Sequence, residues 1–317
     1  MTAIARLDVC VCTFRRPYLA ETLKSLAALE VDGLTVRIVI ADNDDTPSAA
    51  ALVDALRPAL PFAVHYVHGP ARNISVARNA CLDAADAEFI AFVDDDETVT
   101  PTWLLALYAE ALRTGADAVL GPVEAVYDPS TPDWMRRGDF HSTLPVIVKG
   151  EILTGYTCNV LIRRSELSRP LRFDIGLGTS GGEDTDYFTR LYERGGRLVF
   201  APDALVREPV PAGRASFGWL LQRRLRAGQT HGAQARRGRP AQAARTGALA
   251  LAKIAYCLTI TALTLPSPVA WRRNLLRATL HLGVLGGLAG TRQAAIYGGR
   301  DPNNNHLDHA RAEASDA

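Results

Sequence analysis

The feature of the sequence that most constrains its fold is an alternation of short apolar runs with helical patterns over the first 127 residues. The runs end in polar residues, as buried parallel strands do, and the patterns between them repeat leucine or alanine at helical spacing. The expected strands are 7–14, 36–44, 64–69, 88–97 and 117–127, and the expected helices begin at Pro17 and cover 49–60, 75–85 and 102–113. This order predicts an α/β protein with a right-handed, doubly wound and mostly parallel sheet. Further along, we expect strands at 156–162 and 197–206 and a helix from about Glu183 to Glu193, after an irregular region at 128–180.

Polar side chains stand where three of these strands end. Thr13 closes the first strand, Asp42 the second, and Asp94, Asp95 and Asp96 the fourth. In doubly wound sheets ligands bind just beyond the carboxyl ends of the strands, so we expect these residues to lie near one another. Asp42, within VIADND, could accept a hydrogen bond from a base or a ribose hydroxyl.

The acids Asp94-Asp95-Asp96-Glu97 directly follow the apolar run FIAFV. Four adjacent carboxylates repel one another, and at the end of a buried strand they are costly unless a cation lies among them. Asp94 and Asp96 point the same way on an extended chain. This favours Mg²⁺ or Mn²⁺ bridging to a nucleotide diphosphate. The alternative is a solvated acidic turn that caps a helix.

A second candidate is Gly181-Gly182-Glu183-Asp184 at the start of an expected helix. Paired glycines let a backbone approach a ligand closely, and Asp184 or Glu183 could then act as a general base. The alternative is an ordinary acidic first turn that favours the helix dipole.

Arginines supply the third kind of candidate. Arg78 lies on the helix before the acidic strand, where it could reach a diphosphate or hold the acids, or could simply be a surface residue. Arg223 and Arg226 lie in the basic segment QRRLRAG, downstream of Arg214. Guanidinium groups suit a phosphate leaving group or an anionic lipid surface. The alternative is a solvated basic helix.

Charge and apolar residues divide the chain into unlike parts. Residues 207–300 carry 15 Lys and Arg and a single acid, whereas the net charge of the whole chain is only +1. Arginines flank the two apolar stretches 247–265 and 278–290. The first is barely long enough to cross a bilayer, and the second is too short to cross it alone. We expect these stretches to hold the protein on an anionic membrane surface without fully crossing it. The alternative is a pair of buried helices in a soluble domain.

The N-terminal residues and the cysteines indicate a reducing compartment. MTAIARLDVCVCTF lacks the basic start and sustained apolar run of a secretory signal, so we expect the bulk of the protein in the cytosol. Five cysteines without CxxC spacing are expected to be small apolar core residues, and the seven histidines show no metal-ligand spacing.

A resemblance to the family 2 glycosyltransferases is carried by five motifs, in the expected order within about residues 5–230: VCVCTFRRPYLAETLKSL, VIADND, ARNACLDAADAEFIAFVDDDE, GGEDTDYFTRL and WLLQRRLRAG. The chain most resembles the bacterial polysaccharide branch that includes succinoglycan glucosyltransferases. The resemblance implies a GT-A fold and transfer of a sugar from a nucleotide-diphosphate sugar, with UDP the expected nucleotide. It also implies a divalent metal and inversion at the anomeric carbon.

The resemblance also assigns roles by motif. It implies that Asp96 binds the metal directly and that Asp94 completes the DxD pair. Asp184 would be the catalytic base, with Glu183 beside it. By motif, Thr13, Asp42, Asp94 and Asp95 would also bind the nucleotide sugar. From their own positions in the sequence, we expect Arg78, Arg223 and Arg226 to bind it as well.

The sequence departs from the family pattern in two places. Leu225 occupies the arginine position of the QxxRW motif of processive members and no tryptophan follows, which favours addition of a single sugar. Arg207-Glu208 stand where relatives often carry a histidine, so a metal ligand is not expected there.

We therefore expect a GT-A domain at 1–230, with a donor-binding half at about 1–127 and an acceptor half at about 128–230. Membrane-associating helices would follow at 231–300 and a disordered polar tail at 301–317. The expected function is a bacterial, non-processive inverting glycosyltransferase on the cytoplasmic face of the cell membrane, with a lipid-linked or polysaccharide acceptor and no nucleic acid partner. Two alternatives are a DxDxT phosphatase of the haloacid-dehalogenase type and a non-catalytic membrane-docking protein.

Overall fold

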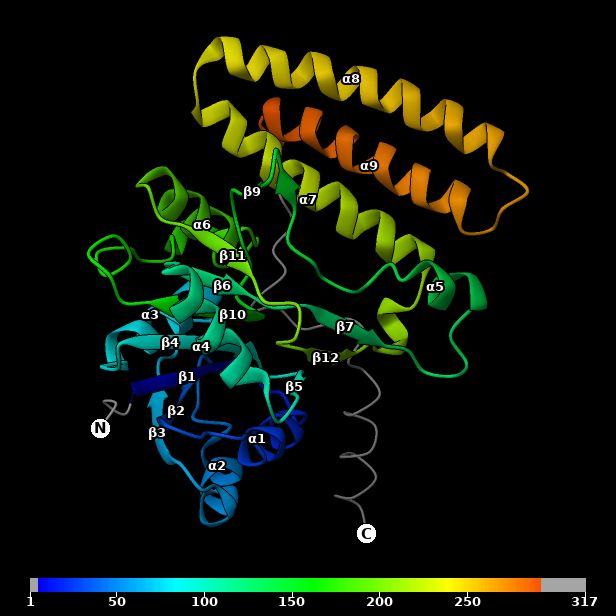
Figure 1. The fold of residues 1–317 in the computed structure, drawn as a ribbon. Helices are drawn as coiled ribbons and strands as arrows, with labels where there is room; N and C mark the ends of the chain where they lie inside the picture. The colour runs from blue at the N-terminus through cyan, green and yellow to red at the C-terminus, as the bar shows by residue number, and fades with distance from the viewer. Residues whose placement is uncertain (1–4, 292–317) are drawn as a thin grey trace.

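The computed structural model describes residues 5–291 (Figure 1). A central sheet carries helices on both faces, and three long C-terminal helices form a separate layer beside it. The strands are β1 (Ala5–Thr13), β2 (Leu34–Asp42), β3 (Ala63–His68), β4 (Phe89–Asp94), β5 (Thr98–Val99), β6 (Ala118–Leu120), β7 (Val123–Val126), β8 (Ile147–Val148), β9 (Glu151–Ile152), β10 (Asn159–Arg163), β11 (Leu198–Phe200) and β12 (Val206–Pro209). The α-helices are α1 (Leu19–Ala27), α2 (Ala50–Leu56), α3 (Ile74–Ala84), α4 (Trp103–Thr114), α5 (Asp133–Gly138), α6 (Glu183–Glu193), α7 (Phe217–Arg237), α8 (Pro240–Leu263) and α9 (Ala270–Leu288).

The central sheet has seven strands in the order β11-β6-β10-β4-β1-β2-β3. All neighbours pair in parallel except β10, which runs antiparallel to both β4 and β6. The doubly wound, mostly parallel sheet expected from the sequence is confirmed. The register pairs Thr13 with Asp42 and Cys12 with Asp94, so the ends of β1, β2 and β4 meet at one edge.

Both faces of the sheet are buried, which explains the near-continuous apolar strands. On one face Val9 and Val11 of β1 pack in a cluster with Trp103 of α4, and on the other Cys10 packs in a cluster with Phe173. All five cysteines are free, and four of them are buried, as expected of small apolar core residues.

Two expected strands are each divided. The run 117–127 separates into β6 and β7 at Gly121-Pro122. In the run 197–206, only the first part forms a strand, β11, and the last residue, Val206, begins β12. A Cβ on Gly121 would lie 2.4 Å from the Ala204 carbonyl, so the chain bends there against a close neighbour. β7 and β12 join β5 in a second, three-stranded sheet that borders the site.

The C-terminal layer consists of α7, α8 and α9, which lie side by side in Figure 1. α7 and α9 cross at very short range, because a Cβ added at any of four glycines would lie 1.9–2.2 Å from a carbonyl oxygen of the facing helix. These glycines are Gly228, Gly232, Gly283 and Gly287. At the start of α9, the Arg272 guanidinium stacks on two tryptophans: it lies 4.4 Å from the ring centroid of Trp134, in α5, and 4.2 Å from that of Trp271.

The apolar stretches belong to helices longer than the sequence predicts. α8 begins at Pro240, which suits a first helical position, and Arg272 and Arg273 lie in the first turn of α9 rather than in a connection. By length and composition alone, α8 could cross a membrane, and little of it is buried. The domain boundary expected at residue 230 falls inside α7 and stays a prediction. The expected tail at 301–317 lies outside the described residues.

Candidate active site

The acidic turn after β4 forms the floor of the site. Asp94 is the last residue of the strand, and its N–H donates to the buried Glu97 carboxylate at 2.9 Å, which closes the turn. The exposed fraction of the side chain is 40% for Asp94, 20% for Asp96 and 10% for Asp95. Asp94 and Asp96 are thus the carboxylates that a ligand can reach most readily.

Three arginines from distant segments converge on this turn. Arg16, in the loop after β1, lies 3.5 Å from Asp95 and 3.6 Å from Asp96. Arg214, just before α7, lies 3.8 Å from Asp96, and Arg78 of α3 lies 3.9 Å from Asp94. Sequence reasoning expected Arg78 here and noted Arg214 only as part of a basic segment, and it missed Arg16. The available signal was the Arg15-Arg16 pair in the loop after a parallel strand that ends beside Asp94, but it does not say which of the two contacts the acids.

The arginines do not fully offset the negative charge. The pKa of Asp94 is raised to about 6: burial is the main cause, Arg78 opposes it, and the neighbouring Asp96 and Asp184 add to it. Burial and Asp96 likewise raise the pKa of Asp95 to about 7, against Arg16. A site in which ionisation is this unfavourable gains from an added cation.

The Gly-Gly-Glu-Asp segment brings a second acid to the site. Gly181 and Gly182 have φ angles of 87° and 95°, and Gly182 is the N-cap of α6. Glu183 is buried and pairs with Arg78, whereas Asp184 is only half-buried and close enough to Asp94 to raise its pKa. The helix expected at 183–193 is confirmed. The two adjacent acids therefore have different surroundings. The Glu183 carboxylate is paired with Arg78, whereas the Asp184 carboxylate remains accessible to a ligand.

Other expected site residues lie around this centre. Thr13 lies against Asp95. Asp42 is fully buried and accepts hydrogen bonds from the Ala49 N–H at 2.8 Å and the Tyr66 hydroxyl at 2.6 Å. It therefore fixes the loop after β2, and its role in nucleoside binding stays a prediction.

One arginine of α7, Arg223, acts on the site through its charge. Arg223 stacks on Trp219 at 5.4 Å from the ring centroid. Burial and the charge of Asp96 raise the pKa of Glu208, and the charges of Arg214, which pairs with it at 2.8 Å, and of Arg223 oppose this rise. Arg226 follows three residues later and is half-buried. Arg223 is thus connected to the acidic turn through Glu208 and Arg214.

Comparison with known proteins identifies the family. The profile of glycosyl transferase family 2 matches residues 8–169, and that of glycosyl transferase family group 2 matches residues 89–289. The chain is 54% identical over 298 residues to the succinoglycan biosynthesis protein ExoM of Rhizobium meliloti, covering 93% of this chain and 96% of that protein. The chain belongs to glycosyl transferase family 2. The resemblance seen in the motifs is thereby confirmed.

Solved structures share the fold of this family 2 protein. The mannosyltransferase PcManGT from Pyrobaculum calidifontis matches with a TM-score of 0.53 and 20% identity, covering 99% of this chain and 81% of that chain. TarS from S. aureus matches with a TM-score of 0.51 and 22% identity over 70% of this chain. The present chain spans only 39% of that TarS chain. The GT-A class is confirmed, and membership of this family excludes the DxDxT phosphatase and supports an enzyme over a non-catalytic docking protein.

The donor set of this glycosyltransferase fits a metal shared with a substrate. Within residues 5–291 no three His, Cys, Asp or Glu side chains converge as an all-protein metal site. Mg²⁺ is commonly held by one or two carboxylates together with substrate phosphates, and Asp94 and Asp96 supply two hard oxygen donors at the accessible end of β4.

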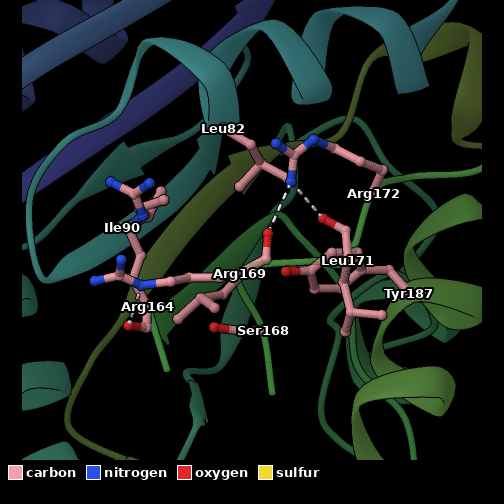
Figure 2. Close-up of a pocket in the computed structure, with 9 residues that line it drawn as sticks. Leu82, Ile90, Arg164, Ser168, Arg169, Leu171, Arg172 and Tyr187 are labelled. Atoms are coloured by element: carbon pink, nitrogen blue, oxygen red, sulfur yellow. Dashed lines mark hydrogen bonds between the residues drawn. The ribbon is translucent and has the colours of Figure 1, made fainter. Parts of the chain in front are cut away.

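A small pocket elsewhere in the glycosyltransferase is unrelated to this site (Figure 2). It holds about 30 Å³ and is lined by Ile90, near the start of β4 and thus toward the opposite edge of the sheet. Figure 2 shows that its arginines are engaged with backbone oxygens: Arg169 donates to the Arg164 carbonyl and Arg172 to the Leu171 carbonyl. These arginines tie the 163–172 loop together rather than line a substrate site.

Proposed function

We propose that the chain transfers one sugar from a nucleotide-diphosphate sugar, with UDP the expected nucleotide, to a lipid-linked or polysaccharide acceptor, inverting the anomeric carbon. The observation that carries this proposal is the meeting of Asp94, Asp96 and Asp184 with the three arginines at one edge of the sheet. Such a site presents cationic groups for a diphosphate and an accessible carboxylate for an acceptor hydroxyl.

The donor diphosphate would lie against the acidic turn and its arginines. Asp96 and Asp94 would hold Mg²⁺ or Mn²⁺, which when bound neutralises charge on the diphosphate. PcManGT was crystallised with GDP-Man and Mn²⁺, which supports a divalent metal here. Arg16 and Arg214 now pair with Asp95 and Asp96, and they would donate hydrogen bonds to the departing phosphate oxygens.

Asp184 would act as the general base. In a single displacement the acceptor oxygen forms a bond to the anomeric carbon as the bond from that carbon to the diphosphate breaks, and the carboxylate of Asp184 takes the acceptor proton. Glu183 is unsuited to this role, because it is buried and paired with Arg78. We assign Glu183 to holding Arg78 beside Asp94.

The relatives and the sequence of α7 support the proposed acceptor and product. ExoM is named for succinoglycan biosynthesis, and we propose that this chain likewise builds a bacterial exopolysaccharide. Leu225 stands where processive members carry the arginine of QxxRW, which supports transfer of a single residue rather than polymerisation. We keep the division into a donor half at 1–127, an acceptor half at 128–230 and membrane-associating helices after it.

The helical layer would place the enzyme on the cytoplasmic face of the membrane. α8 exposes a series of large apolar side chains, each with an exposed fraction of 47–72%: Leu249, Leu251, Tyr256, Leu258 and Leu263. Arginines flank α8 and α9, where anionic headgroups attract them. A lipid-linked acceptor would be met at this surface.

Donor binding and product configuration test the proposal. The purified chain is titrated with UDP and GDP sugars with and without Mn²⁺, and the unfolding temperature is recorded, since binding to the native state raises it. We expect a rise with at least one donor that requires the metal. NMR of the transfer product should show the anomeric configuration opposite to that of the donor. Retained configuration, or no donor that binds, would contradict the proposal.

A further inference from the structure

A second, larger cavity lies between α5, α7 and α9, outside the acidic site. It holds about 320 Å³ and opens to the surface. Its walls come from the first half of α7, the first half of α9 and the segment that follows α5. This volume falls at the lower end of the range for small-molecule sites.

The cavity carries an excess of positive charge. Arg224, Arg273 and Arg277 line it, against one carboxylate, Asp139. The Asp139 carboxylate accepts a hydrogen bond from the Ser142 hydroxyl at 2.6 Å, and within residues 5–291 no acidic side chain lies within 4.0 Å of the three guanidinium groups. Burial lowers the pKa of Arg224, and the charges of Arg223 and Arg277 lower it further. An anion in the cavity would relieve this repulsion.

One of the three arginines is already fixed in place. Arg273 donates to the Gly138 carbonyl at 2.8 Å and lies over the Phe140 ring at 5.8 Å from its centroid. A guanidinium held in this way loses little freedom when it binds a ligand, because one of its nitrogens is anchored.

Apolar side chains share the same walls. Phe140 and Leu276 are buried, and Leu280 lines the cavity one turn further along α9. The ligand that suits such walls is an anion joined to an apolar chain, rather than a free anion.

The cavity is also connected to the acidic site through the chain. Phe140 is followed by His141, whose Nε2 lies 3.1 Å from the Arg214 carbonyl, and Arg214 lies 3.8 Å from Asp96. Further along α7, Thr230 is the residue that a Cβ on Gly182 would contact, and Gly182 stands two residues before Asp184. The six residues from Arg224 to Thr230 correspond to about 9 Å along a helix axis.

We propose that this cavity binds the phosphate or diphosphate group of an amphiphile, with Arg224, Arg273 and Arg277 as anion ligands and Phe140, Leu276 and Leu280 against its apolar chain. The inference rests on the proposed function in one respect, that the glycan acceptor is carried on a lipid. The phosphate would then anchor the carrier while the glycan extends toward Asp184. The same chemistry could come from a bilayer phospholipid, and the experiment separates the two sources.

The test uses the full chain and short, soluble probes. Isothermal titration calorimetry measures the affinity for farnesyl diphosphate, inorganic diphosphate, farnesol and dihexanoyl phosphatidylglycerol, each in the presence of saturating UDP and Mn²⁺ to occupy the donor site. The variants are Arg277→Gln and Arg224→Gln, and the matched control is Arg245→Gln, an exposed arginine of α8 that does not line the cavity. Circular dichroism confirms that each variant is folded.

We expect farnesyl diphosphate to bind at least tenfold more tightly than inorganic diphosphate or farnesol. Each cavity variant should weaken binding about tenfold, as expected for loss of a charged hydrogen bond, and Arg245→Gln should leave it unchanged. Tighter binding of farnesyl diphosphate than of phosphatidylglycerol identifies a lipid-diphosphate carrier, and the reverse order identifies a bilayer headgroup. Either order supports the cavity as the site, provided that binding depends on Arg277 and Arg224.

Three results would overturn the proposal: no binding of either amphiphile, equal binding by the cavity variants, or an equal loss in Arg245→Gln. The last would show a diffuse attraction between the basic helices and anions. Donor binding, measured on the same wild-type protein, is independent of this result. A chain that binds farnesyl diphosphate through Arg277 but binds no nucleotide sugar would retain the cavity site and lose the proposed function.

Discussion

Arg78 and Glu183 form a buried ion pair that joins α3 to the first turn of α6, and the Arg78 guanidinium also lies 3.9 Å from Asp94. One arginine therefore links a structural carboxylate to the acidic turn of the site. Both members of the pair are almost fully buried, with exposed fractions of 6% and 2% for the side chains.

Replacing Arg78 by methionine should lower the free energy of unfolding by about 3–5 kcal/mol, because the buried Glu183 carboxylate loses its counter-charge. The double variant Arg78→Met/Glu183→Gln should recover much of this loss, since no unpaired charge remains. Denaturant unfolding of wild type, both single variants and the double variant measures the coupling. Losses that simply add would contradict a stabilising pair.

Asp96→Ala should weaken metal-dependent binding of the nucleotide at least about tenfold, because it removes a hard oxygen donor from the accessible end of β4. The fold should persist, since one of several mutually repelling carboxylates is lost. The matched control is Asp32→Ala, an exposed acid just before β2, at the end of that strand opposite to Asp42 and the site. Calorimetry with UDP and Mn²⁺ is the measurement, and unchanged affinity in Asp96→Ala would exclude the metal role.

Asp184→Asn should bind the donor normally and lose transfer by at least roughly 10²-fold, because an amide keeps the shape of the carboxylate but cannot accept the proton. Asp186→Asn serves as the control, since the Asp186 carboxylate is engaged with Arg190 at 2.8 Å and Arg237 at 3.7 Å. Single-turnover transfer and donor affinity are measured for both. Near-normal transfer by Asp184→Asn would show that another residue acts as the general base.

Because of His141, we expect the protein to lose stability at mildly acidic pH. The pKa of the His141 imidazole is lowered to about 4: burial is the main cause, the Arg214 carbonyl and Asp139 oppose it, and the charges of Arg223 and Arg214 add to it. Above pH 6.5 the His141 ring is neutral in both the folded and the unfolded protein. Below pH 6.5 the unfolded chain takes up the proton first, so the free energy of unfolding falls progressively until about pH 4. This one group should cost about 2 kcal/mol between pH 7 and pH 5. Denaturant unfolding at both pH values should show a smaller decrease for His141→Gln, and an identical decrease would contradict the prediction.

The exposed leucines of α8 should control membrane binding. Leu251→Glu/Leu258→Glu should reduce partitioning into phosphatidylglycerol vesicles more than about tenfold, because each leucine buried in lipid contributes roughly 1.5–3 kcal/mol. Leu112→Glu, at a leucine of α4 that is 56% exposed, is the matched control. Labelling of the 264–269 connection from the periplasmic side would instead show that the helices cross the bilayer.

Much of the fold and the acidic centre could be predicted, because both depend on local patterns. Apolar runs that end in acids predict parallel strands, and parallel strands bring Thr13, Asp42 and Asp94 to one edge whatever the details of packing. The two glycines before Glu183 likewise predict the start of α6, which begins at that residue.

The features that escaped prediction depend on contacts between distant segments. Nothing in the local sequence distinguishes Arg16, which contacts Asp95 and Asp96, from its neighbour Arg15, which pairs with Asp44. The bend at Gly121 reflects the nearby Ala204 carbonyl, which belongs to a segment far along the chain. Side-chain direction and close approach are set by the assembled fold, so periodicity alone cannot reveal them.

The glycine crossing of α7 and α9 has a mechanical consequence. Since backbone meets backbone with no room for a methyl group, the two helices cannot slide or roll past each other without losing many contacts at once. α7 begins three residues after Arg214. The Arg214 guanidinium, which lies beside Asp96, is therefore attached directly to the rigid helical layer. If that layer rests on a bilayer, as we propose, the protein would set the height of the acidic turn above the lipid, and an acceptor would be selected by how far its glycan reaches.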